Sequence, residues 1–262
     1  MLRKFLTIAV ISASLFSAGA AGTAPAAGAV VAKNALIYGD SLTYESRFQL
    51  ADRFALRAGW TQHTHGVAQT APCDWLQSMP ADLASYQPSV VGVLTAGNTG
   101  GTACMTAPTG SVEYYAQYRA DLASLFAMVT ATGAKLVFFN APPFVNADRN
   151  ATAKQINAIA LDLAYQYRGV SIAGTVRTAL SNSGAYTQTK PCIPTETAAM
   201  GCTGGRITIR TLPGFTDYGL HLCPTGLPAG TFGICSTYSS GEYRFARAMT
   251  NSLASPPKPK LP

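Results

Sequence analysis

Short apolar runs alternate along this chain with longer segments in which apolar residues recur every three or four positions. Apolar runs bounded by turn residues predict buried strands, whereas the longer periodic segments predict amphipathic helices. Strands that alternate with helices are typical of a parallel sheet covered on both faces, so we expect an α/β fold. The expected strands are 34–40, 89–98, 134–143 and 169–174, and the expected helices are 43–59, 111–133, 148–168 and 239–253.

Three of the expected strands end in small or polar residues. These are Gly-Asp-Ser (39–41), Gly-Asn (97–98) and Asn-Ala-Pro (140–142). The carboxyl ends of parallel strands meet at one edge of the sheet, which is where α/β proteins bind their ligands. The sequence therefore predicts a binding crevice formed by these strand ends.

The first residues are typical of an export signal. Arg3 and Lys4 precede an apolar, alanine-rich run, 5–16, and the small residues at 18–20 fit a signal peptidase site. The apolar run is short for a membrane span, so we expect a cut between about residues 20 and 29 rather than stable membrane insertion. The mature chain is then secreted, either outside the cell or into the cell envelope or periplasm.

Beyond a signal peptide over 1–29, the chain is long enough for one large core. Segment 182–237 is rich in glycine, threonine and proline and holds four of the six cysteines. We therefore expect loops stapled by disulfides there, rather than a second domain. The prolines and lysines of 255–262 predict a short disordered tail. The expected result is a single domain over 30–254.

Composition indicates a globular protein, because 48% of the residues are hydrophobic and only 12% are charged. The net charge of +7 overstates the basic character of the folded part, since Arg3, Lys4, Lys258 and Lys260 lie in the signal and the tail. No basic cluster remains along the rest of the sequence, which argues against a nucleic-acid partner. We expect a monomer.

Six cysteines in an exported chain predict three disulfides. A zinc site is the alternative, but the sequence has no Cys-x-x-Cys spacing and only three histidines. We therefore expect no metal and no cofactor. The sequence does not fix the pairing, but proximity along the chain favours Cys192 with Cys202, Cys223 with Cys235 and, by remainder, Cys73 with Cys104.

Ser41 lies in Gly-Asp-Ser-Leu, directly after the first expected strand and just before the first expected helix. A serine at this place is typical of a helix N-cap, whose hydroxyl accepts a backbone N–H. It also suits a nucleophile, because the helix dipole and the free N–H groups of the first turn stabilise negative charge there. The two interpretations are compatible, but a nucleophilic serine also needs a base.

The three histidines are the candidates for that base. His221 lies in a turn-rich stretch, with Asp217 four residues earlier. This carboxylate is suited to orient the imidazole and to stabilise its protonated form. His63 and His65 alternate in WTQHTHGV, which predicts a strand with both rings on one face. Solvated histidines are more common on such strands than catalytic ones, so we assign His221 as the base.

A serine nucleophile also needs donors for the oxyanion, each worth about 3 kcal/mol. The N–H of Ser41 and the side-chain amide of Asn98 are the first two candidates, although an asparagine before two glycines is also typical of a turn. A third donor is expected from the loop after the two strand histidines. Gly66 is the obvious small residue there, and residues 68–69 offer alternative N–H groups.

These residues resemble the motifs of the SGNH, or GDSL-type, hydrolases. The resemblance rests on Ser41 in YGDSLT, a glycine in a second block, Asn98 in AGN and His221 near an aspartate, and it covers roughly 34–253. The stretches TAPCDWL and LHLCP are similar to exported, disulfide-bearing members of actinobacterial type. The resemblance implies a flavodoxin-like three-layer α/β/α sandwich and a serine acyl-enzyme without a metal. It also implies that Ser41 is nucleophile and first oxyanion donor, Asn98 a further donor and His221 the base.

Three positions depart from the family pattern. The aspartate stands four residues before the histidine rather than three, so a backbone carbonyl could orient His221 in place of Asp217. Residues 68–69 are Ala-Gln where a glycine is usual, and Asn98 is followed by Thr99 where an aspartate is usual. None of these differences removes the serine or the histidine.

We therefore expect a secreted serine ester hydrolase that acts on short acyl esters of carbohydrates or lipids. An O-acyltransferase would use the same residues, and only its acceptor would distinguish it. A non-catalytic glycan-binding protein on the same fold is the third interpretation, with Trp75, the tyrosines and the loops of 182–237 lining a groove. The α/β-hydrolase fold fits poorly, because its Gly-x-Ser-x-Gly elbow needs a glycine where Thr43 stands.

Overall fold

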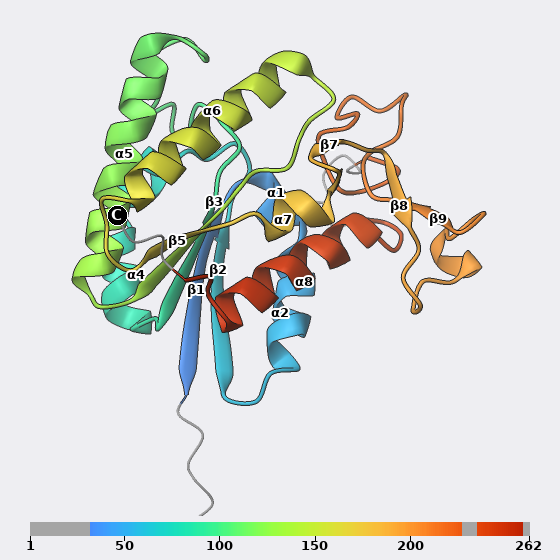
Figure 1. Cartoon of the computed structure of the whole chain (residues 1–262), viewed down its shortest axis with the longest axis horizontal. Helices are drawn as coiled ribbons and strands as arrows, with labels where there is room; N and C mark the ends of the chain where they lie inside the picture. Colours follow the sequence, from blue (N-terminus) through green and yellow to red (C-terminus); the bar gives the residue numbers. More distant parts are fainter. Residues whose placement is uncertain (1–31, 227–234, 259–262) are drawn as a thin grey trace, which may run out of the picture. The chain divides into compact units, whose positions relative to one another are not determined.

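The computed structural model describes residues 32–226 and 235–258, so the expected signal peptide and the end of the expected tail lie outside the described residues. A five-stranded parallel sheet forms the centre of the fold, in the order β2-β1-β3-β4-β5 (Figure 1). This is the strand order of flavodoxin-like folds. The strands are β1 (Lys33–Gly39), β2 (Trp60–Gly66), β3 (Val90–Leu94), β4 (Lys135–Phe139) and β5 (Val170–Ala173).

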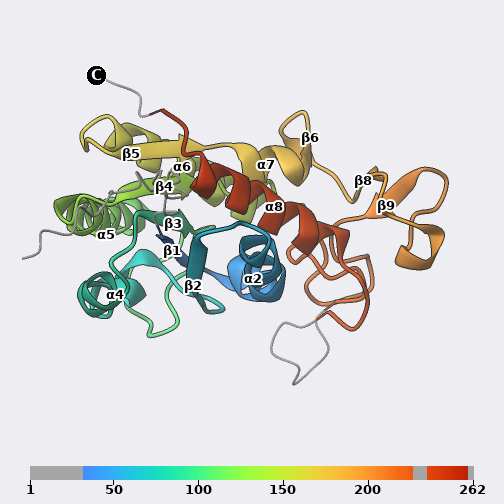
Figure 2. The same ribbon diagram turned by 90° about the horizontal axis from the view of Figure 1, so that it is seen from below.

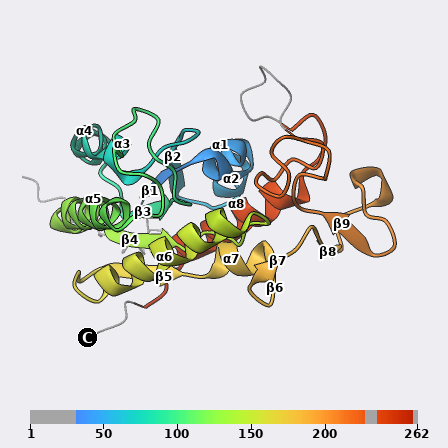
Figure 3. The same cartoon turned by 90° about the horizontal axis from the view of Figure 1, so that it is seen from above.

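Helices cover both faces of the sheet, as Figures 2 and 3 show. Successive strand residues point to opposite faces, so Ile37 joins one hydrophobic core and Leu36 joins the other. The expected three-layer α/β/α sandwich is therefore confirmed. One layer holds α2 (Arg47–Ala55), α7 (Thr175–Ala179) and α8 (Ser240–Ala254), and the other holds α3 (Pro72–Leu76), α4 (Met79–Tyr86), α5 (Val112–Ala131) and α6 (Ala147–Ala164).

The central strands read as unbroken apolar runs because a helix layer lies on each side of them. All five residues of β3 are buried, and in β4 only Lys135, the first residue, is exposed. Helices cover the edge strand β2 only in part, and most of its residues are half-buried. That difference explains why β3 and β4 give the clearest strand patterns in the sequence.

The structure differs from the expected elements in three respects. The expected helix 43–59 is two helices, α1 (Ser41–Glu45) and α2, which meet at Ser46. Helices α3, α4 and α7 were not expected, because five to eight residues make too few turns for a helical period to emerge. The segment after residue 180, where the sequence predicted loops, contains β6 (Ser181–Asn182), β7 (Ala185–Tyr186), β8 (Thr189–Pro191), η1 (Ala198–Met200) and β9 (Arg206–Thr208).

Three disulfides join the six cysteines in the pairs that proximity favours. Cys192–Cys202 and Cys223–Cys235 lie in the loop-rich segment that follows β5, where little regular structure restrains the chain. Each cross-link over a loop this short restricts the unfolded chain and thereby stabilises the native state by about 3 kcal/mol. Among the helices of the described residues, none has the length and the apolar character needed to cross a membrane.

Glu242, in the first turn of α8, lies against the Cys223–Cys235 disulfide, with its Oε1 2.8 Å from the Cys235 Sγ. Burial raises the pKa of this carboxyl to about 8. Between about pH 4.5 and 8 the native state therefore keeps a proton that the unfolded chain has lost, and the free energy of unfolding falls as the pH rises.

Glu242→Gln is expected to flatten this decline, because an amide carries no charge at any pH in that range. Denaturant unfolding at pH 5 and pH 8.5 measures the effect. The variant and the parent should be of similar stability at pH 5, whereas the variant should be more stable by about 1–3 kcal/mol at pH 8.5. An equal pH dependence in both proteins would contradict the assignment.

Candidate active site

Ser41 is the first residue of α1 and directly follows the carboxyl end of β1. The N-cap of this helix is Asp40, whose Oδ1 accepts the N–H of Leu42 at 3.1 Å, so the expectation that Ser41 itself is the cap is wrong. The Ser41 hydroxyl is thus not engaged in capping. A Cβ at Gly39 would overlap the Thr43 side chain, which explains the glycine before the turn.

The structure brings Ser41, His221 and Asp217 together, although 180 residues separate the first two in the chain. The Ser41 Oγ is 3.2 Å from His221 Nε2, and His221 Nδ1 is 2.9 Å from Asp217 Oδ2. The four-residue spacing is accommodated by a turn in which the N–H of Leu220 bonds to the Asp217 carbonyl at 2.9 Å. Thr211 donates its hydroxyl to the same Asp217 oxygen at 3.3 Å.

His221 is mostly buried, with 15% of its side chain exposed. Burial lowers the pKa of the imidazole below its usual value, and the hydrogen bond to Asp217 opposes this shift. The ring is therefore neutral near pH 7 and ready to accept a proton at Nε2, with its Nδ1–H directed to Asp217.

Arg210, which is fully buried, stabilises the loop that carries His221. Its guanidinium donates to the carbonyl of Leu220 at 3.0 Å and to the carbonyl of Pro143 at 3.1 Å. The N–H of Thr211 also bonds to the His221 carbonyl at 3.1 Å. Arg210 was not singled out in the sequence, because a lone arginine after a short apolar run is usually solvated.

Glu45 is a second acidic residue that lies next to His221, and the sequence pattern did not predict it. Its side chain is fully buried, and its Oε1 is 3.4 Å from His221 Nε2, the nitrogen that faces Ser41. Its Oε2 accepts the N–H of Leu222 at 2.9 Å. Glu45 stands four residues after Ser41, one helical turn along α1, and this spacing is the signal that could have found it.

Asn98 follows β3 at the same edge of the sheet. Its Nδ2 is 3.4 Å from both Asp40 Oδ2 and the carbonyl of Thr70, while its Oδ1 accepts from Arg149 at 3.4 Å. The amide N–H groups are therefore directed at Asp40 and Thr70, and a donor role for Asn98 towards the oxyanion stays a prediction. Asp40 is buried and accepts the N–H of Ala96 at 2.9 Å, and burial raises its pKa to about 6.

Gly66 is the last residue of β2 and packs against the backbone of α1. A Cβ there would lie 2.7 Å from the backbone nitrogen of Tyr44, so close approach of the two chain segments requires this glycine. The neighbouring Gln69 has a positive φ of 65° and lines a cavity together with Asn98. A donor role for the N–H of Gly66 stays a prediction.

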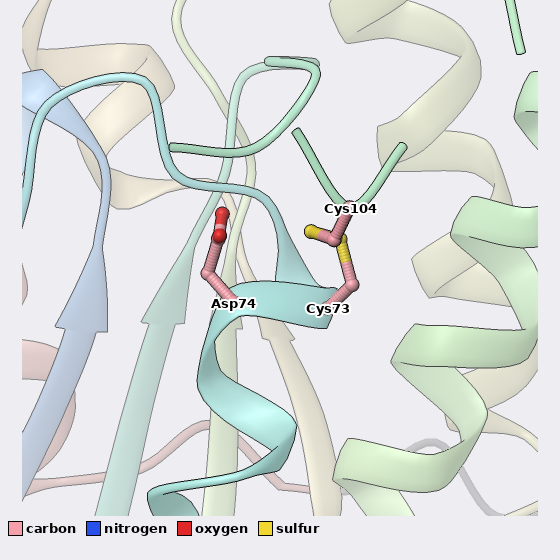
Figure 4. Close-up of side chains that lie close together, drawn as sticks. All are labelled: Cys73, Asp74 and Cys104. Atoms are coloured by element: carbon pink, nitrogen blue, oxygen red, sulfur yellow. A yellow bond between two sulfur atoms is a disulfide. The ribbon is translucent and has the colours of Figure 1, made fainter. Parts of the chain in front are cut away.

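The loop that follows Asn98 is fastened to α3 by Asp74 and by the Cys73–Cys104 disulfide, which Figure 4 shows side by side. Asp74 Oδ2 accepts the N–H groups of Ala71 and Gly101, and Oδ1 accepts the N–H of Thr102, each at 2.9 Å. Both sulfurs are engaged in the disulfide, so Cys73, Asp74 and Cys104 do not form a thiolate metal site.

Two cavities lie near the candidate site and share Asn146 and Arg149. The first, the polar cavity, has a volume of about 850 Å³, and the second, the apolar cavity, has about 420 Å³. Neither lining includes Ser41 or His221, but Asn98 lines the polar cavity and Asp217 lines the apolar cavity. The polar cavity is lined by Gln69, Gly97, Asn98, Thr99, Thr109, Gly110, Tyr115, Asn146, Asp148, Arg149, Ala151 and Thr152, and the apolar cavity by Phe144, Val145, Asn146, Arg149, Thr216, Asp217, Tyr218, Gly219 and Leu220.

The other two histidines lie away from Ser41, on β2. His63 stacks on Tyr86 of α4 at 3.7 Å between ring centroids, and His65 stacks on Tyr38 at 5.1 Å. Trp75, considered above as a groove residue, is only 4% exposed and belongs to a hydrophobic core. The expectation that Trp75 lines a glycan groove is therefore wrong.

Residues 34–200 match the model of a family described as "Protein of unknown function (DUF459)", a family associated with SGNH-like hydrolases. None of the curated proteins matches the chain. Among solved structures, TesA has 17% identity and a TM-score of 0.50, covering 84% of this chain and 98% of TesA.

Two further structures are similar at lower scores. Axe2, an acetylxylan esterase from Geobacillus stearothermophilus, has 13% identity and a TM-score of 0.45, with 60% of this chain and 87% of Axe2 covered. The psychrotrophic esterase EstA from Pseudoalteromonas sp. has 16% identity and a TM-score of 0.41, with 58% and 82% covered. The likeness to TesA agrees with the sandwich fold described above.

Proposed function

The chain belongs to the DUF459 family, and we propose that it is a serine ester hydrolase that works through an acyl-enzyme at Ser41. The observation that carries the proposal is the chain of contacts from Ser41 Oγ through His221 to Asp217, with distances of 3.2 and 2.9 Å. These are the distances of a nucleophile, a base and an orienting carboxylate. The association of the family with SGNH-like hydrolases supports the same chemistry.

In the acylation step the Ser41 Oγ attacks the carbonyl carbon of the ester while its proton moves to His221 Nε2. The tetrahedral oxyanion is stabilised by N–H donors, for which the N–H of Ser41 and the Asn98 amide are the first choices. The N–H of the first helical residue has no acceptor inside the helix, so it is available to the oxyanion. A donor from 66–69 completes the hole, and Gln69 is the residue of this segment that lines the polar cavity together with Asn98.

The intermediate collapses when the bond between the carbonyl carbon and the alcohol oxygen breaks. The leaving alkoxide takes the proton from His221 Nε2, and the acyl group remains on Ser41. A water molecule then attacks the acyl carbon, its proton moves to Nε2, and the carboxylic acid leaves as Ser41 recovers its proton. Asp217 stabilises the imidazolium in both steps.

The two cavities support a short acyl group on a polar alcohol. The apolar cavity beside Asp217 offers Phe144, Val145 and Leu220 in about 420 Å³, which suits a short acyl chain. The polar cavity beside Asn98 offers amides, hydroxyls and one guanidinium, which suit the hydroxyl groups of a carbohydrate better than a lipid tail. Within the expected classes of substrate we therefore favour acylated carbohydrates. Export is part of the proposal, and the three disulfides are compatible with it.

Hydrolysis of p-nitrophenyl esters from acetate to palmitate tests the proposal. We expect the highest kcat/KM at acetate to butyrate and a decline from octanoate onward, because the acyl chain outgrows the apolar cavity. Pretreatment with an aryl fluorophosphonate should abolish hydrolysis: the Ser41 Oγ displaces fluoride, HF is lost, and the peptide that contains Ser41 gains the mass of the phosphonyl group. A chain labelled at Ser41 but inactive on all esters would point to an O-acyltransferase, and a chain neither labelled nor active would point to a binding protein.

A further inference from the structure

The environment of Glu45 is unusual for a buried carboxyl group. Its Oε2 accepts the N–H of Leu222, whereas its Oε1 has no hydrogen-bond partner among the described residues and lies 3.4 Å from the imidazole Nε2 of His221. An unpaired carboxyl oxygen inside a protein costs free energy unless it meets a proton donor or carries a proton itself. Within the described part of the chain, the group of that kind recorded beside Oε1 is His221 Nε2, which also faces Ser41.

Resting on the proposed function, we propose that Glu45 is a positioning residue that controls the proton at His221 Nε2. In its anionic form it accepts the Nε2–H of the imidazolium that forms when Ser41 gives up its proton. In its protonated form it donates to the Nε2 lone pair and competes with Ser41 for it. The anionic form therefore favours reaction and the protonated form suppresses it.

The charges around Glu45 fit this role. Arg210 is the buried cation that favours its anionic form, whereas Asp217, and Glu242 once it has lost its proton, oppose it. Burial is the largest influence and raises the pKa of Glu45 well above its usual value. His221, whose pKa burial lowers, faces Asp217 as its close carboxylate partner and Arg149 and Arg210 as the surrounding cations.

Two such groups within hydrogen-bonding reach share their protons and titrate as a pair. The reactive state, with Glu45 anionic and His221 neutral, requires the loss of both protons. The acid limb of kcat/KM then follows the higher of the two pKa values of the pair. Without the carboxylate, the limb follows the lowered pKa of His221 alone, at a more acid pH.

Glu45→Gln tests this inference, because the carbonyl of the glutamine still accepts the N–H of Leu222. At pH 8 we expect kcat on p-nitrophenyl acetate to fall about tenfold, since the imidazolium has lost its second acceptor. The acid limb of kcat/KM should move to lower pH by about one unit or more. Glu113→Gln, the same substitution on the exposed start of α5, is the matched control and should leave both unchanged. A structural role alone would leave kcat and the pH profile of Glu45→Gln at their parental values.

Nitrogen-15 NMR of the histidine rings provides a readout that needs no turnover. The chain has only three histidines, and the spectrum of His221→Gln assigns the resonances of His221 by their absence. We expect the Nε2 shift of His221 to titrate in two steps in the parent and in one step in Glu45→Gln. Identical single-step curves would overturn the inference. A parent that hydrolyses no ester would instead contradict the proposed function, while the NMR curves would still decide the pairing of Glu45 with His221.

Discussion

Replacing Ser41 with alanine is expected to lower kcat by about 10⁵- to 10⁶-fold with little change in KM. The substitution removes the hydroxyl that gives its proton to His221 Nε2 and attacks the ester carbonyl, so the acyl-enzyme cannot form. The fold should persist, because Asp40 rather than Ser41 caps α1 and the Ser41 side chain bonds to no described residue except His221. Hydrolysis of p-nitrophenyl acetate, with thermal unfolding as a check on folding, measures the effect.

The matched control is Ser124→Ala, on the exposed side of α5, which should retain parental kcat. His221→Gln should cost about as much as Ser41→Ala, and the double variant should be no worse than either single one, because the two residues act as one unit. Independent, multiplying losses would argue that Ser41 and His221 do not serve the same step. Parental activity in Ser41→Ala would refute the serine mechanism.

The sheet and the edge that carries the candidate site could be predicted because each depends on local sequence. Buried strands such as β3 and β4 must be apolar throughout, and the turns after them must be small or polar. Once the strands are known to be parallel, Ser41 and Asn98 necessarily lie at one edge. His221 could be identified from the sequence for a simpler reason, because the chain has only three histidines.

The remaining parts of the site depend on contacts that no local pattern encodes. In the sequence, Glu45 is an ordinary polar position of an amphipathic helix. It is buried because the helix is interrupted at Ser46 and because the chain at Leu222 packs against its side chain. Arg210 is buried because it holds two carbonyl groups from distant loops, those of Pro143 and Leu220. Which residue between 66 and 69 faces the oxyanion depends on loop geometry, such as the positive φ of Gln69, rather than on composition.

Asp217→Asn is expected to lower kcat by about 10⁴-fold, and it decides what orients His221. The spacing of four residues left a backbone carbonyl as an alternative in the sequence. In the structure, Asp217 Oδ2 is 2.9 Å from His221 Nδ1 and also accepts from Thr211. An asparagine can turn its NH₂ towards Nδ1, which favours the tautomer with the proton on Nε2, and that nitrogen then cannot accept the proton of Ser41.

The pH dependence of kcat/KM distinguishes a change in the tautomer of His221 from disruption of the loop that carries His221. Asp217 raises the pKa of His221 through its hydrogen bond and its charge, so its removal destabilises the imidazolium. The acid limb of the residual kcat/KM should therefore move to lower pH in Asp217→Asn. The control is Asp162→Asn, at a surface position with 57% of its side chain exposed, which should leave both kcat and the limb unchanged. A loss in Asp217→Asn of less than about tenfold, with the limb in place, would mean that another group orients the ring, because an orienting carboxylate contributes far more than that.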